Sequence, residues 1–143
     1  MEIIHPLTMK LLAAFAQPKI ILFFFIGQLI FSTLIFPHYQ NQLENITEEP
    51  LPVLDIRISY NLETVQNLFD QYGSEGIAIS KKLHYLIDML YPLFYGGFLA
   101  LFLIYLMGKN IWIGWLPIIG VVLDVAENLS ILRLLNQYPN LTE

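Results

Sequence analysis

Residues 111–135 read IWIGWLPIIGVVLDVAENLSILRLL, an apolar stretch with two carboxylates and a carboxamide in its second half. At a rise of about 1.5 Å per residue, a helix of this length can cross a bilayer core of about 30 Å. Asp124, Glu127 and Asn128 are spaced i, i+3 and i+4, so they lie on one side of that helix. Because such groups are costly against hydrocarbon, we predict that this side faces protein, water or a ligand.

The composition around this stretch is that of a polytopic membrane protein. Of the 143 residues, 56% are hydrophobic and only 13% are charged, well below the quarter that is usual in soluble domains. The chain carries only seven Lys and Arg against a net charge of -5, which excludes a basic surface for nucleic acid. It has no cysteine, which excludes disulfides, thiol catalysis and thiolate metal ligands.

Two further apolar runs predict two more spans, in residues 20–36 and 83–107. The second span is followed almost at once by the stretch quoted above, since only Gly108-Lys109-Asn110 separates the two. They are therefore predicted to form an antiparallel hairpin. The expected fold class is all-α, an integral membrane protein with three transmembrane helices in one domain formed by residues 1–143.

Two segments outside the spans are predicted to be helical as well. Residues 1–17 have a short amphipathic pattern and are expected to lie on the membrane surface as an interfacial helix. Residues 37–82 hold seven of the twelve acidic residues and are predicted to be an extramembrane loop. Within that loop a short helix over residues 62–72 is expected, capped by Asn61 and ended by Gly73.

The positions of the positive charges predict the orientation of the chain. Lys10 and Lys19 precede the first span and Lys109 lies in the hairpin turn, so these ends are expected in the cytoplasm. The loop over residues 37–82 and the C-terminal tail over residues 136–143 are then expected on the outer side. The predicted localisation is a multi-pass membrane protein.

Polar residues of the second span recur on one side that can meet the polar side of the third. His84, Asp88, Tyr91 and Tyr95 are spaced i, i+4, i+7 and i+11, which is a helical repeat. In a hairpin the two sides meet at the same depth. The sequence therefore predicts one polar cluster of seven residues: His84, Asp88, Tyr91, Tyr95, Asp124, Glu127 and Asn128.

Three functions are compatible with such a cluster. In the one we favour, it fixes helix packing or holds a polar ligand in a structural or accessory membrane subunit. In the second, a membrane-embedded enzyme uses His84, Asp88 and Glu127 for acid–base or metal-assisted chemistry on a lipid-like substrate. In the third, the carboxylates carry protons or ions across the membrane.

A metal site is a weaker hypothesis. His84, Asp88, Asp124 and Glu127 are possible ligands, but no two of them stand at a recognised ligand spacing, so no metal or other cofactor is predicted. Three spans alone bury carboxylates poorly. The expected partners are therefore membrane lipids and either further copies of this chain or other membrane protein subunits.

Four short motifs follow one another along residues 54–139. They are Leu54-Asp55-x-Arg57, Tyr72-Gly73-x-x-Gly76, Asp88-x-x-Tyr91-Pro92-x-x-Tyr95 and Asp124-x-x-Glu127-Asn128. In these motifs the chain resembles a group of small uncharacterised polytopic membrane proteins. The resemblance implies a polytopic helical architecture, and it brings no activity with it.

Overall fold

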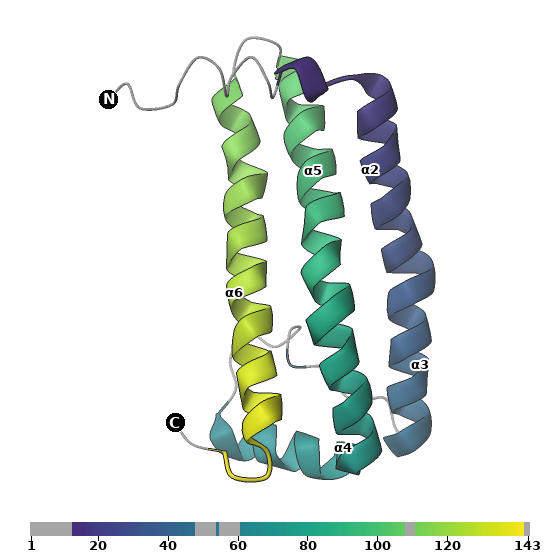
Figure 1. Ribbon diagram of the computed structural model, residues 1–143, viewed down its shortest axis with the longest axis vertical. Coiled ribbons are helices and arrows are strands. Elements are labelled where there is room, and N and C mark those ends of the chain that lie inside the picture. The colour runs from purple at the N-terminus through teal and green to yellow at the C-terminus, as the bar shows by residue number, and fades with distance from the viewer. Residues whose placement is uncertain (1–12, 48–53, 55–60, 108–110, 142–143) are drawn as a thin grey trace, which may run out of the picture.

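The computed structural model describes residues 13–47, 54, 61–107 and 111–141, and every element named in these ranges is helical. The elements are α2 (Pro18–Ile30), η1 (Phe31–Ile35), α3 (Phe36–Thr47), α4 (Leu62–Lys82), η3 (Leu83–Ile87), α5 (Asp88–Met107), η4 (Ile111–Gly114) and α6 (Trp115–Gln137). Three long helical rods stand side by side with α5 in the middle (Figure 1). The interfacial helix expected over residues 1–17 lies mostly outside the described residues.

The first rod is longer than the sequence indicated. It runs without a break from α2 through η1 and α3, so the prediction of a loop beginning at residue 37 is wrong. Pro37 removes the N–H that the carbonyl four residues earlier would use. The turn just before it is π-helical, with the N–H of Phe36 bonded five residues back to the carbonyl of Phe31. The wider turn lets the helix continue past the proline.

The α4 helix is bent at Gly73, whose φ of 59° lies in the left-handed region. Glycine adopts this conformation without a steric penalty. The first part of α4 crosses one end of the three side-by-side helices, and the second part of α4 turns up into η3 and α5 (Figure 1). Asn61 caps the helix by accepting a 2.8 Å hydrogen bond from the N–H of Thr64. The predicted loop is wrong here too, because residues 74–82 continue as helix into the next rod.

The first part of α4 closes one end of the layer by packing on α3 and α6. The apolar side chains there form one core cluster, in which Val65 and Phe69 are 1% exposed and Leu135 is fully buried. The buried members are Leu43, Leu54, Val65, Leu68, Phe69, Tyr72, Ile77, Ile131 and Leu135. Removing this apolar area from water holds the bent α4 against the rods.

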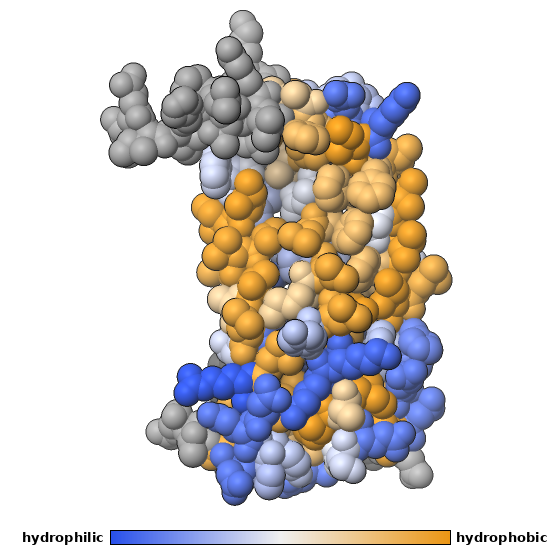
Figure 2. Space-filling view, viewed as in Figure 1, coloured by the Kyte–Doolittle hydropathy of each residue, from blue (hydrophilic) through white to orange (hydrophobic). Residues whose placement is uncertain are grey.

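The surface has an apolar belt and one hydrophilic end. Figure 2 shows hydrophobic side chains over the rods and a hydrophilic band at the end where α3 and α4 lie. Two helices, Pro18–Ile46 and Leu62–Met107, are long and apolar enough to cross a membrane, and only 11% and 28% of their most apolar windows are buried. A core helix of a soluble protein would be mostly buried, so this exposed apolar surface indicates membrane association.

Candidate functional site

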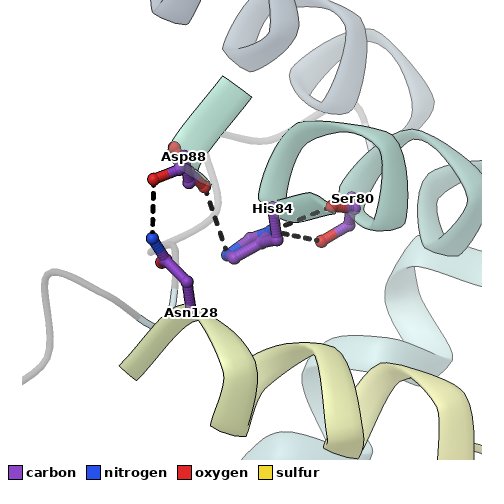
Figure 3. A network of polar contacts seen from close by, with 4 residues as sticks. All are labelled: Ser80, His84, Asp88 and Asn128. Carbon is purple, nitrogen blue, oxygen red and sulfur yellow. Dashed lines mark hydrogen bonds and ion pairs between the residues drawn. The ribbon is translucent and has the colours of Figure 1, made fainter. Parts of the chain in front are cut away.

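The predicted polar cluster is divided into three parts in the structure. His84, Asp88 and Asn128 are buried and belong to one network at the junction of η3, α5 and α6 (Figure 3). Tyr95 and Asp124 are half-buried and form a second contact between α5 and α6, with half-buried Tyr91 beside them. Glu127 is exposed.

The network joins α6 to α5 through a main-chain atom. The side-chain Nδ2 of Asn128 donates a 2.9 Å hydrogen bond to the carbonyl oxygen of Asp88. That carbonyl is four residues before Pro92, which has no N–H to donate. The spacing of polar residues predicted a contact for Asn128 but not its partner. That partner is the main-chain carbonyl of Asp88, which receives no N–H from Pro92.

The imidazole of His84 is 2% exposed and contacts polar groups on both of its edges. Its Nδ1 lies 2.9 Å from the carbonyl oxygen of Ser80, which can only accept, so Nδ1 carries a hydrogen. Its Nε2 lies 3.8 Å from Oδ2 of Asp88. The sequence did not predict that the carbonyl of Ser80 would be a hydrogen-bond partner of His84.

A π-helical turn precedes these groups. In η3 the N–H of Asp88 bonds five residues back to the carbonyl of Leu83. Such turns insert an extra residue into the helical repeat and are frequent at functional positions. His84 and Asp88 remain on the same buried side of the rod, facing α6.

The second contact is a hydrogen bond between side chains of neighbouring rods. The hydroxyl of Tyr95 donates to Oδ2 of Asp124 at 2.5 Å. The ring of Tyr91 lies 5.2 Å from that of Tyr95 and packs edge-on against Phe36 of α3. Tyr91 thus extends an aromatic contact toward the first rod.

The candidate metal ligands do not converge. Within the described ranges no three His, Asp or Glu side chains lie close enough together to hold a metal ion. His84 and Asp88 are buried at the junction, Asp124 bonds to Tyr95, and Glu127 points to the outside of α6. The single cluster predicted from the sequence is therefore two separate contacts and one exposed carboxylate.

Two spaces between the helices are lined by described residues. A void beside His84 is lined mainly by the apolar cluster under α4 and is too small to admit a water molecule. A larger groove of about 290 Å³ runs between α2 and α5, where Phe25 and Phe98 are among its walls. Its lining is almost entirely apolar, and its described lining residues include the phenol of Tyr105 but no carboxylate or imidazole.

No protein-family model, curated protein or solved structure matches this chain. The geometry itself defines a class, that of all-helical proteins with apolar helices long enough to span a membrane. Within that class, this chain has a packed polar network at one end of its apolar belt.

Proposed function

We propose that this protein is a structural or accessory membrane subunit with three spans, in which the polar network fixes how the helices pack. The observation that carries the proposal is the burial of His84, Asp88 and Asn128 in one network that joins α5 to α6. Their partners are the carbonyl of Ser80, the carbonyl of Asp88 and each other. Hydrogen bonds of this kind hold helices in register inside membranes.

The third span of the proposal is α6, which has 23 residues and stands beside α5 (Figure 1). Its outer side exposes large apolar residues such as Leu116 at 66% and Leu123 at 64%, which suit a lipid environment. By the positive-inside rule, Lys10, Lys19 and Lys109 favour a cytoplasmic location for the start of α2 and for the ends of α5 and α6 that residues 108–110 join. The end closed by α4 and the C-terminus of the chain is then on the outer side.

An enzyme is less well supported than a structural subunit. A membrane enzyme built on His84, Asp88 and Glu127 would need these groups to reach one substrate. The first two are buried at the junction of η3, α5 and α6, whereas Glu127 is exposed on α6. Proton or ion translocation would need a polar path, and the void beside His84 admits no water.

The topology can be tested with single cysteines, because the natural chain has none. Ala14→Cys, Ser74→Cys and Asn136→Cys alter exposed residues at the two ends of the rods. In intact cells a membrane-impermeant maleimide should label Ser74→Cys and Asn136→Cys but not Ala14→Cys. Labelling of Ala14→Cys alone would reverse the proposed orientation and leave the three spans. Labelling of only one of Ser74→Cys and Asn136→Cys would overturn the three-span arrangement.

The structural role can be tested by comparing neighbouring positions of α6. Asn128→Leu removes a buried hydrogen bond, whereas Glu127→Gln changes an exposed side chain next to it. We expect Asn128→Leu to lower the thermal midpoint of the detergent-solubilised protein and Glu127→Gln to leave it nearly unchanged. Equal midpoints for the two variants would contradict the structural role of the network.

A further inference from the structure

On two of the rods the exposed side changes from apolar to basic within one helical turn. On α6, Leu129 is 56% exposed, and Arg133, four residues later, is exposed as well. On the rod that runs from α4 through η3 into α5, Leu86 is 47% exposed, and Lys82, four residues earlier, is also exposed. Residues four apart lie on the same side of a helix. Each rod therefore carries a cation next to the edge of the apolar belt, toward the end closed by α4.

Contacts between the rods place these cations at one level. Ser80 of α4 and Ile131 of α6 line the same small void, and each of them is two residues away from a cation, Lys82 and Arg133 respectively. The Nζ atom of Lys82 lies 5.8 Å from the centre of the Tyr39 ring, so the level extends to α3 of the first rod. Figure 2 shows hydrophilic side chains in a row across the molecule at this edge of the belt.

The row contains Lys81, Lys82 and Arg133, which we name the basic band. None of the three has an ion-pair partner among the residues that the structure describes. The exposed acids Glu63 and Asp70 belong to the first part of α4, which crosses the end of the rods farther from the belt (Figure 1). Positive charge is thus concentrated next to the belt, although the net charge of the chain is -5.

The level of the basic band is the level at which a bilayer carries its phosphate groups. Lys and Arg lay their apolar stems along such a surface and hold their charges in the headgroup layer. Tyr85, in the turn that follows the two lysines, is 74% exposed, and tyrosine also favours this layer. Cations without counter-charges attract phospholipids of net negative charge. A zwitterionic headgroup brings its own positive charge and leaves theirs uncompensated.

We propose that the basic band binds the phosphate groups of anionic phospholipids. The inference rests on the proposed function, since it requires the three rods to span the bilayer, and it holds for either orientation of the chain. An occupant of the band has to lie against the cations and also against the apolar side chains beside them. A phospholipid does so with its headgroup and its acyl chains, whereas a soluble acidic protein matches the cations alone. The proposed accessory subunit thus gains a preferred class of lipid.

Native mass spectrometry of the detergent-solubilised full chain tests this preference. The protein is mixed with equal amounts of phosphatidylglycerol and phosphatidylcholine that have the same acyl chains, and the bound lipids of each class are counted. We expect the natural chain to prefer phosphatidylglycerol, and Lys82→Gln and Arg133→Gln each to lower this preference about fivefold. Arg133→Lys keeps the charge and should keep the preference. Equal binding of the two lipids by the natural chain would overturn the inference.

A charge-balanced variant separates the basic band from the net charge. Glu63→Gln removes an exposed negative charge from α4. Combined with Arg133→Gln, it removes one charge of each sign, so the net charge stays at -5 while the band remains incomplete. We expect this double variant to have the same reduced preference as Arg133→Gln alone. If Glu63→Gln restores the preference, the net charge selects the lipid and the inference is wrong.

The single-cysteine proteins separate this inference from the proposed function. If impermeant maleimide labels both Ser74→Cys and Asn136→Cys but the natural chain has no lipid preference, the basic band does not select lipid and the three-span arrangement stands. If only one of the two is labelled, the ends of α4 and α6 lie on opposite sides of the membrane. The three cations then do not share one headgroup layer, and both proposals are wrong.

Discussion

The Nδ2 atom of Asn128 lies 2.9 Å from the carbonyl oxygen of Asp88 and donates a hydrogen bond to it. In an unbroken helix that oxygen would accept from the N–H of residue 92, but residue 92 is proline. In an apolar environment an unpaired carbonyl is costly, and neighbouring helices commonly supply the missing partner. Asn128 thus donates from α6 to a carbonyl of α5 that cannot receive an N–H from residue 92.

We expect Asn128→Ala to lower the free energy of unfolding in detergent by about 1–2 kcal/mol, because the Asp88 carbonyl loses its donor. Pro92→Ala restores an N–H within α5 and should recover part of this loss when it is combined with Asn128→Ala. The measurement is a double-mutant cycle by thermal or SDS-induced unfolding. Strictly additive effects would show that the two residues are not coupled through that carbonyl.

The contact between His84 and Asp88 leads to a second prediction. His84→Leu removes the donor to the Ser80 carbonyl and the ring that faces Oδ2 of Asp88 at 3.8 Å. It should destabilise the fold by about 1–3 kcal/mol, the usual cost of leaving a buried polar group without a partner. His84→Leu with Asp88→Leu removes both polar groups and should be less destabilising than His84→Leu alone. Unfolding of the purified variants measures both effects.

The proton position at His84 can be observed directly. Because Nδ1 donates to the carbonyl of Ser80, the ¹⁵N shift of Nδ1 should be that of a protonated ring nitrogen in the folded protein. An unprotonated Nδ1 would rule out this hydrogen bond.

The hydrogen bond between Tyr95 and Asp124 gives a third prediction with a matched control. Tyr95→Phe keeps the ring and removes the donor of the 2.5 Å contact, so we expect a loss of about 0.6–2 kcal/mol in unfolding free energy. Tyr91→Phe makes the same change one turn earlier, at a residue whose described contacts are with other rings. It should have a smaller effect, and the opposite ranking would contradict the assignment.

The sequence predicts those features of the fold that depend on local patterns. The apolar runs, the Asn61 cap and the helical repeat of His84 and Asp88 are local patterns, and the cap is confirmed by its hydrogen bond to Thr64. The continuation of the first helix through Pro37 was not predictable from composition, since it depends on a π-helical turn that shifts the backbone pairing.

The candidate site was predicted only in part for a similar reason. Asp124, Glu127 and Asn128 share a broad side of α6, but Glu127 and Asn128 differ by about 100° around the helix. The rotation of α6 against α5 decides which of them is buried. The two helices approach closely at Gly96, where an added Cβ would lie 2.1 Å from Cγ2 of Val121. Spacing alone could not assign Asn128 to the interior and Glu127 to the surface.

The same packing supplies a fourth prediction. A Cβ on Gly96 would lie 2.1 Å from Cγ2 of Val121, whereas one on Gly120 would meet nothing closer than the Tyr95 hydroxyl at 3.9 Å. Gly96→Ala should therefore push α5 and α6 apart and lower the thermal midpoint, and Gly120→Ala should not. Val121→Ala removes the clashing methyl group and should partly rescue Gly96→Ala. Failure of that rescue would mean that the two helices are not packed through this contact.

The fifth prediction concerns pH and the end of the molecule closed by α4. The Tyr138 hydroxyl, just beyond α6, donates a 2.8 Å hydrogen bond to Oδ1 of Asp70 on α4. This bond raises the pKa of Tyr138, with burial and the negative charge of Asp70 adding to the effect. Because the folded pKa is above the unfolded value of about 10, the contact is complete below that pH. Its contribution to stability is lost as the pH rises through the folded pKa.

Replacing the carboxylate of Asp70 distinguishes the loss of the Asp70–Tyr138 hydrogen bond from general unfolding at alkaline pH. In Asp70→Asn the charge that opposes ionisation of Tyr138 is absent, so the pKa of Tyr138 should fall toward that of an ordinary tyrosine. Gln71→Ala changes the exposed neighbouring residue and should leave the titration as it is in the natural chain. The ¹³Cζ shift of Tyr138, followed by NMR from pH 8 to the alkaline limit of the folded protein, measures each midpoint. Identical midpoints in the natural chain and Asp70→Asn would show that α4 is not held to the end of α6 through this pair.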